Sequence, residues 1–306
     1  MTRMRRSSVD LRKILNVAQL PALPQSAVRL LELSQDPENG PAEYAVPIEA
    51  DAGLAGQVLR FVNSSYFGFS REISSVKLAI TLVGVRTIKN FSLWSAVFSL
   101  MPNPKCGPFD LRRLWQDSLR RALFARLTAK LLGCGEAEEP FAAALLQDMA
   151  VPVLAKEAPQ LYEKLLSARH EGERRLSDLE DSVFGWTHAK AAGDMARQWN
   201  LPEAFAVLVE SHPYIERWAS DPRREPAKAA VALSALLPAT ADPVWHERGP
   251  FEEYYRKVAP AGSPEVVELL RQTDEEFIDF APVLKVSAPR KSLAESFDEA
   301  SALAPA

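Results

Sequence analysis

The sequence predicts an all-α protein, and three observations support this. Apolar residues recur at the three- and four-residue spacing of amphipathic helices through almost all of the 306 residues. Convincing alternation of apolar and polar residues, and runs of β-branched residues, are missing, so that no strand is predicted. The 23 prolines lie mostly between the periodic segments, where they separate helices without interrupting them. We therefore expect a helical bundle, arranged in two lobes.

Composition and charge are those of a globular protein. With 47% apolar and 25% charged residues, the chain can bury one large or two modest cores. Its formal net charge of −4 gives no field that would hold it on nucleic acid or on an anionic membrane. A helix-turn-helix over residues 42–62 is disfavoured because that segment is acidic. We therefore expect no nucleic-acid binding.

The basic N-terminal segment, residues 1–19, does not resemble a signal peptide, because no apolar run follows its arginines. No later segment approaches the ~18 uncharged apolar residues of a membrane-spanning helix. Cys106 and Cys134 are too isolated for a disulfide framework or a cysteine metal site. We expect no membrane insertion and a cytoplasmic location.

The first lobe is expected over residues 20–105. Its apolar spacing predicts helices over residues 28–33, 42–50, 54–62, 76–83 and 88–98. The loop after the third of these contains Asn63, Tyr66, Phe67, Gly68 and Phe69. These aromatic side chains could form a recognition surface, but burial in a joint between helices is their commoner fate. Asn63 is expected to fix the turn and not to bind a ligand.

The second lobe is expected over residues 106–285. Three prolines and a glycine within residues 101–108 mark the boundary, because they cannot continue a helix. The apolar pattern then predicts helices over residues 109–133, 138–155, 187–199, 200–212, 227–237 and 264–284. Beyond residue 285 the composition falls to Ala, Ser, Pro and Glu, so residues 286–306 are expected to form a mobile tail.

Local signals mark the ends of two helices in this lobe. Ser177 and Glu180 have the spacing of a capping box, in which each side chain satisfies a backbone donor at a helix start. Gly185 is expected to close that helix, and Thr187 to cap the next one.

The order of these landmarks resembles the bacterial HDOD domain over residues 20–285. The stretches that carry the resemblance are LPALP, LAGQVLRFVNSSYFGF, ISSVKLAITLVGVRTIKNF, FDLRRLWQDSL, LLQDMAVPVL, FGWTHAKAAG, QWNLPEAF and ESHP. That family is related to the metal-dependent HD phosphohydrolases and is generally regarded as a signalling output module. The resemblance implies an all-α fold in two lobes, of which the second is HD-like.

The resemblance also points to candidate site residues. Catalytic relatives hold divalent metal with a first His, a His-Asp pair, later histidines and a late Asp. In this sequence the first His is replaced by Asp117, the pair reads Gln147-Asp148, and His188 and His212 match the later histidines.

Two further positions depart from that pattern. Ser211 stands where a histidine would precede His212, and no acid lies near residues 233–235. Asp242 follows seven residues after Ala235.

Ligand chemistry makes catalysis by this set unfavourable. Metal-assisted hydrolysis needs imidazole and carboxylate ligands that converge on the ion, and a Gln offers only a neutral oxygen. Asp117 is expected to be a solvated or arginine-paired acid on a helix face, and Asp148 an acid that bonds to a neighbouring helix. The alternative is a residual site in which Asp117, Asp148, His188 and His212 hold one divalent ion.

The two histidines also have local alternatives. His188 stands at a helix start beside Thr187, and His212 stands at a helix end, where its imidazole can bond free carbonyls. No cofactor is expected. If a metal is bound at all, Asp148, His188 and His212 are the expected ligands.

The leading hypothesis is a non-enzymatic signalling module that acts on signalling proteins in trans or through a small ligand at the lobe interface. The alternative is a metal-dependent phosphohydrolase acting on a nucleotide or cyclic dinucleotide through a site rebuilt around Asp148, His188 and His212. A purely structural adaptor is a third possibility. The sequence carries no signal for an oligomeric state.

Overall fold

The computed structural model describes residues 10–11, 13–14 and 20–302. Most of the basic segment 1–19 therefore lies outside the described residues. Over the described part of the chain the structure is helical and contains no strand, which confirms the predicted all-α class. None of the helices described is long and apolar enough to cross a membrane.

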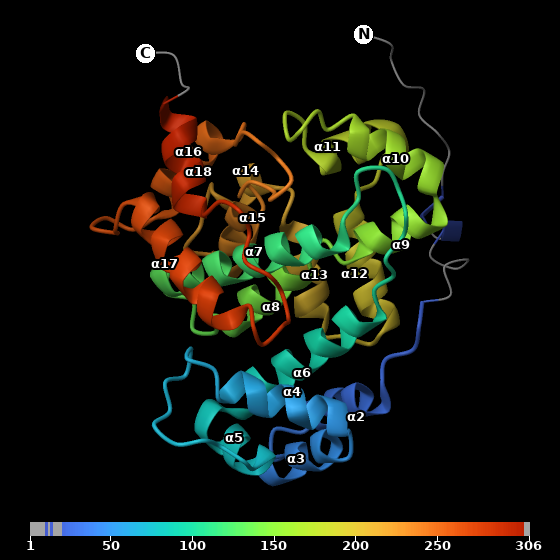
Figure 1. The fold of residues 1–306 in the computed structure, drawn as a ribbon, viewed down its shortest axis with the longest axis vertical. Coiled ribbons are helices and arrows are strands. Elements are labelled where there is room, and N and C mark those ends of the chain that lie inside the picture. The colour runs from blue at the N-terminus through green and yellow to red at the C-terminus, as the bar shows by residue number, and fades with distance from the viewer. Residues whose placement is uncertain (1–9, 12, 15–19, 303–306) are drawn as a thin grey trace.

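The first lobe is a group of short helices at one end of the molecule (Figure 1). It contains α2 (Gln25–Leu33), α3 (Pro41–Glu49), α4 (Ala52–Val62), α5 (Val76–Val83) and α6 (Val85–Leu100). The side chain of Asp51 caps α4 by accepting from the backbone N–H of Leu54 at 3.0 Å. Gly84, at φ +97°, ends α5 and starts α6, because few residues with a side chain adopt that conformation.

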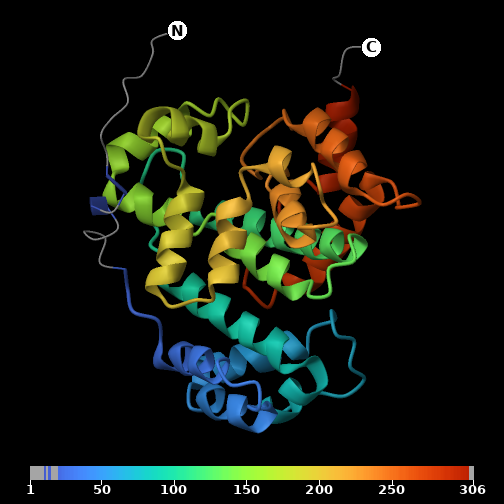
Figure 2. The ribbon, with the colours of Figure 1, turned by 180° about the vertical axis from the view of Figure 1, so that it is seen from behind.

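The second lobe holds the remaining helices. They are α7 (Leu111–Leu131), α8 (Glu138–Leu146), α9 (Ala150–Glu157), α10 (Pro159–Ser167), α11 (Leu176–Phe184), α12 (His188–Gln198), α13 (Glu203–Ser211), α14 (Ile215–Trp218), α15 (Pro226–Ser234), α16 (Arg248–Val258), α17 (Val266–Phe280) and α18 (Leu293–Ala302). The long helix α7 lies in the middle and packs against α8, α15 and α17. Seen from behind, α12 and α13 lie side by side (Figure 2).

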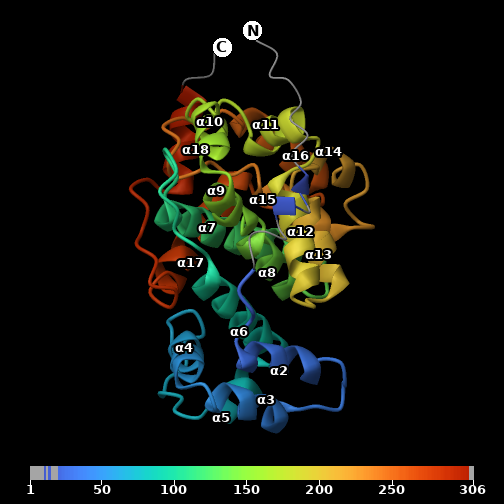
Figure 3. The ribbon, with the colours of Figure 1, turned by 90° about the vertical axis from the view of Figure 1, so that its right-hand side faces the viewer.

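The two lobes share one hydrophobic core. Helix α6 leads from the first lobe to α8 of the second (Figure 3), and Phe98 stacks on Trp115 with ring centroids 3.7 Å apart. One continuous cluster of buried side chains includes Val58 and Phe91 of the first lobe and Leu119 of the second. A second cluster lies between α7 and the C-terminal helices.

The aromatic loop joins the lobes. Asn63 fixes it as expected, because its side chain donates to the carbonyls of Leu59 and Ile73 and accepts from the backbone N–H of Ile73. Tyr66 and Phe67 are half-buried against the core, as predicted. The expected burial of Phe69 is wrong, because 38% of that residue is exposed. Gly68 adopts φ +61° in this turn.

The structure corrects two local predictions. The helix expected over residues 138–155 is two helices, α8 and α9, separated by a turn at residues 147–149. The capping box is also wrong: Arg175 is the N-cap residue of α11 and makes no side-chain cap, while Ser177 and Glu180 are both buried. Gly185 does end this helix in the left-handed conformation, and Thr187 does cap α12.

The expected mobile tail is wrong over residues 287–302. Gln116 on α7 donates to the carbonyl of Ser287 at 2.8 Å, and Asp274 accepts from the first backbone N–H groups of α18. Leu293 and Phe297 are buried in the second cluster. A composition rich in Ala and Ser therefore concealed a short amphipathic helix. Residues 303–306 lie outside the described residues.

Candidate functional site

Asp148 lies at the corner between α8 and α9, where its carboxylate meets Arg121 from α7. The Arg121 guanidinium donates to Asp148 Oδ2, and the two side chains are only 15% and 10% exposed. Burial alone would raise the pKa of Asp148, but Arg121 and His188 outweigh it and hold that pKa well below its usual range. The expected bond from Asp148 to a neighbouring helix is therefore present, and its partner is Arg121.

His188 and His212 approach the other oxygen of Asp148. His188 opens α12, and His212 follows the last residue of α13. The Nε2 atoms of the two rings are 3.0 Å apart, and they lie 3.1 Å and 3.8 Å from Asp148 Oδ1. The sequence predicted local roles for both histidines, and the structure shows that these roles leave each Nε2 facing the same point.

The outer nitrogen of each ring is held by an acceptor. His188 Nδ1 lies 2.6 Å from Glu180 Oε2, which also accepts from the His188 backbone N–H. His212 Nδ1 lies 2.8 Å from the carbonyl oxygen of Val209. Because both contacts are to oxygen atoms that can accept, the hydrogen-bond pattern assigns the hydrogen to each Nδ1, and a neutral ring would present a bare Nε2.

Two bare nitrogens facing each other require a proton or a cation between them. Burial lowers the pKa of His188, but Glu180 and Asp148 outweigh that effect and raise the pKa to about 10. Burial and the neighbouring His188 lower the pKa of His212 to about 3. One proton thus serves both rings, with His188 as the imidazolium.

The donor set fits a single divalent ion. One ligand atom each from Asp148, His188 and His212 lies within 4.8 Å of the others, the one such group in the described part of the chain. A carboxylate and two imidazoles suit zinc, iron or manganese, and the Glu180–His188 bond is the kind of outer contact that orients a metal-binding histidine. Arg121 opposes this fit, because its positive charge already neutralises Asp148.

Gln147 does not join the convergent group. Its side chain is fully buried, and neither amide atom has a hydrogen-bond partner among the described residues. A buried amide without partners is costly, so this position is not optimised for stability.

The position of Asp117 contradicts the prediction that this acid lies on a solvated face of its helix. It is 7% exposed and not solvated, because the segment after α15 covers its face of α7, and Oδ1 accepts from the Thr240 backbone N–H at 2.7 Å. Burial raises the pKa of Asp117 to about 6, against the opposing effect of Arg121. Asp117 also lies outside the group of converging ligand atoms.

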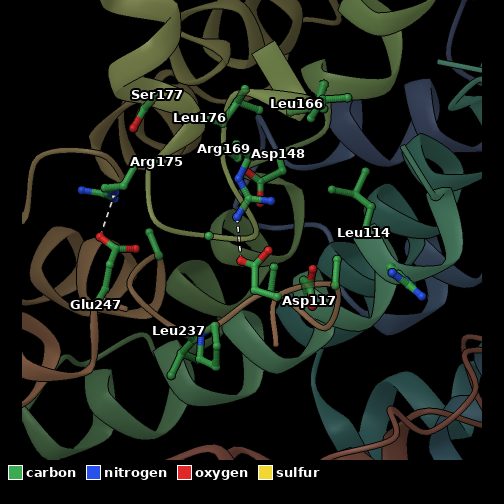
Figure 4. A pocket seen from close by; sticks show the side chains of 18 of the residues that line it. Leu114, Asp117, Asp148, Leu166, Arg169, Arg175, Leu176, Ser177, Leu237 and Glu247 are labelled. Atoms are coloured by element: carbon green, nitrogen blue, oxygen red, sulfur yellow. Dashed lines mark hydrogen bonds and ion pairs between the residues drawn. The ribbon is translucent and has the colours of Figure 1, made fainter. Parts of the chain in front are cut away.

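A cavity of about 170 Å³ opens beside these residues. Besides the site residues, its wall contains charged side chains from α7, from the segment before α11 and from the segment before α16: Asp110, Arg113, Arg169, Arg174, Arg175, Asp242 and Glu247. Two ion pairs join the residues of this wall: Arg169 pairs with Asp242, and Arg175 pairs with Glu247, which Figure 4 labels. Asp242 is therefore engaged by an arginine and is not a ligand of the convergent group.

Sequence reasoning missed Arg121 and Glu180 as site residues. Arg121 follows Asp117 by one helical turn, which was a usable signal that both face the same side of α7. Glu180 was interpreted as part of a capping box, although it bonds His188 and accepts from the Tyr162 hydroxyl at 2.8 Å. Spacing alone could not tell these two uses apart.

Comparison with known proteins places this chain in a family. The HDOD domain matches residues 20–214, which is more than half of the chain. The chain belongs to the HDOD family.

This HDOD protein is 22% identical over 197 residues to an uncharacterised protein of Treponema pallidum (strain Nichols), a match covering 64% of this chain and 38% of that protein. It is 34% identical over 103 residues to the uncharacterised protein YuxH of Bacillus subtilis (strain 168), a match covering 33% of this chain and 24% of that protein. The chain thus spans well under half the length of these two relatives.

Solved structures share the fold. An HDOD domain protein of unknown function from Geobacter sulfurreducens has a TM-score of 0.68 at 20% identity, covering 91% of this chain and 99% of that one. A Marinobacter aquaeolei VT8 protein whose name suggests signal transduction has a TM-score of 0.65 at 20% identity, and the match covers 90% of this chain and 64% of that one. A Shewanella amazonensis SB2B protein whose name suggests a phosphohydrolase has a TM-score of 0.65 at 19% identity, and the match covers 90% of this chain and 98% of that one. At these identities the likeness concerns the fold alone.

Proposed function

We propose that this HDOD protein is a non-enzymatic regulatory module that acts on signalling proteins in trans or through a bound small ligand. The observation that carries the proposal is the Arg121–Asp148 ion pair, with Gln147 beside it. The one carboxylate that faces both histidines is already neutralised by a fixed cation. Membership of a family whose structural neighbours include a protein named for signal transduction supports the same role.

Electrostatics disfavour the chemistry of a paired-metal hydrolase. Two metals stabilise attacking and leaving oxygens only if several anionic ligands offset their charge. Here Asp117 is held by Thr240, Asp242 by Arg169, and Asp148 by Arg121. The set that remains offers ligands for one ion at most, next to a guanidinium that repels it.

Metal content and turnover test this proposal. Purified protein is analysed for Mn, Fe and Zn, and turnover of bis(p-nitrophenyl) phosphate is measured with each ion added. We expect substoichiometric metal and no turnover. A stoichiometric ion that is lost in Asp148→Ala, together with turnover that is lost in the same variant, would overturn the regulatory function.

A metal-dependent phosphohydrolase acting on a nucleotide or cyclic dinucleotide is the second candidate. It is favoured by the two Nε2 atoms and Asp148 Oδ1, which face one point while both Nδ1 atoms are held by acceptors. An ion bound there would act as a Lewis acid. Glu180 and Val209 would orient the rings of His188 and His212 toward the ion, and the Arg121 guanidinium would lie beside it at Asp148.

A further inference from the structure

The loop formed by residues 169–175 crosses the cavity in an unfavourable conformation. Three consecutive residues, His170, Glu171 and Gly172, have φ values of +46°, +56° and +101°. Residues with a side chain seldom adopt this region, and such conformations persist only where surrounding contacts hold them. Contacts with the rest of the protein must therefore hold loop 169–175 in this conformation.

Two ion pairs tie the loop to the opposite wall. Arg169 Nη2 lies 2.7 Å from Asp242 Oδ2, and Arg175 Nε lies 3.3 Å from Glu247 Oε1 (Figure 4). Between them the backbone passes so close that a Cβ added to Gly172 would lie 2.6 Å from Asp242 Oδ2. The closed position of the loop thus depends on acids that the arginines could exchange for other anions.

Two further arginines of the wall, Arg174 and Arg113, have weak or no ionic partners among the described residues. Arg174 is exposed and makes no ion pair with any described residue. Arg113 is half exposed, and its ion pair with Asp110 is long, with 3.9 Å between Nε and Oδ2. Guanidinium groups bind phosphate and carboxylate oxygens in pairs, so these arginines match a ligand with several anionic oxygens.

We infer that the cavity binds a small multiply charged anion, either phosphate-bearing or a polycarboxylate. Arg113 and Arg174 make the first contacts, and the ligand then replaces Asp242 at Arg169 and Glu247 at Arg175. Loop 169–175 is released from the opposite wall when these pairs exchange. This inference deepens the proposed regulatory function and rests on it for its purpose, although the binding can be tested separately.

The full chain is titrated by calorimetry with pyrophosphate and, separately, with citrate. EDTA is present, and sodium chloride holds the ionic strength constant, so that neither a metal nor general screening accounts for binding. Saturable binding of one probe identifies the source as phosphate or carboxylate. We expect Arg174→Gln and Arg113→Gln each to weaken binding about tenfold. Arg271→Gln, an exposed arginine on α17, makes the same change of charge elsewhere and should have no effect.

Asp242→Asn should strengthen anion binding, whereas a variant that simply lost structure would weaken it. It removes the acid that competes for Arg169, so anion binding should tighten several-fold, whereas Asp221→Asn at an exposed position should leave binding unchanged. The inference is overturned if neither probe binds, if Arg271→Gln weakens binding as much as Arg174→Gln, or if Asp242→Asn does not tighten it. Phosphodiester turnover by the wild-type chain would overturn the regulatory function and leave the anion site standing.

Discussion

Helix α7 carries two arginines, the half-buried Arg121 and the fully buried Arg126, whose surroundings differ. Arg121 lies at the edge of the cavity and pairs with Asp148, close to two histidines. Arg126 is 1% exposed and pairs with Glu276 at 2.8 Å, while its guanidinium lies 4.5 Å from the Tyr66 ring centroid and 4.8 Å from that of Phe141. The first arginine neutralises a carboxylate that a metal could use, and the second connects the two lobes.

The difference shows that two arginines on one helix can have different roles. The side chains that surround each guanidinium decide whether it belongs to the cavity or stabilises the fold. Arg126 is surrounded by aromatic rings that exclude water, so its ion pair cannot be exchanged without exposing them. Arg121 has a cavity beside it, so its partner can change.

Arg126→Ala should cause the largest effect. It leaves Glu276 without its charged partner and removes the cation between Tyr66 and Phe141, so the free energy of unfolding should fall by about 4 kcal/mol. Urea unfolding measures the change, with Arg271→Ala as the exposed control. A loss below about 1 kcal/mol would show that the joint does not depend on this arginine.

Arg121→Gln should cost less, about 2 kcal/mol, because Asp148 keeps His188 as a partner. The free carboxylate should then accept a divalent ion together with His188 and His212. Added Mn²⁺ or Zn²⁺ should therefore raise the unfolding midpoint of this variant more than that of the wild type. The double variant Arg121→Gln/Asp148→Ala serves as the control and should not respond. An equal response in the wild type would mean that Arg121 does not keep metal out.

Asp117→Asn should stabilise the protein at neutral pH. The folded pKa of about 6 lies above the ordinary 3.8, so folding binds a proton between these values and wild-type stability falls as pH rises through them. The variant should be more stable by about 1 to 2 kcal/mol at pH 7 and nearly equal to the wild type at pH 4. Thermal unfolding at both pH values measures this, with Asp221→Asn as the exposed control. An equal effect at both pH values would contradict the assigned cause.

Tyr66→Leu should have the smallest effect, because it retains apolar bulk and removes only the aromatic face beneath Arg126. A loss of about 1 kcal/mol is expected in urea unfolding. Phe69→Leu, at an exposed ring of the same loop, should change little. If both variants behave alike, the contact between Arg126 and the ring contributes nothing measurable.

Much of the fold could be predicted from local patterns. The helix over residues 76–83, the break at Gly84 and the capping roles of Thr187 and Gly185 all depend on residues close together in the chain. Helices α10 and α16 and the packed C-terminal helix were not predicted, because short helices depend for their stability on contacts with other elements.

The candidate site was predicted in part. Asp148, His188 and His212 were named from the resemblance, and the structure brings their ligand atoms together. Asp117 was misplaced because the covering segment at Thr240 is more than 120 residues away in the chain. Glu180 was assigned to a helix cap, since a Ser-x-x-Glu spacing cannot tell whether the helix start faces solvent or a buried histidine.

The sequence by itself determined the helical class, because that class follows from the periodicity of apolar residues. The identity of Gln147 gave only the expectation of an incomplete His-Asp pair. Only the tertiary structure decided which charges meet. Arg121 and Asp148 are 27 positions apart, and Arg126 and Glu276 are 150 apart. Electrostatic partners are chosen by the packing of whole helices, which spacing along the chain does not reveal.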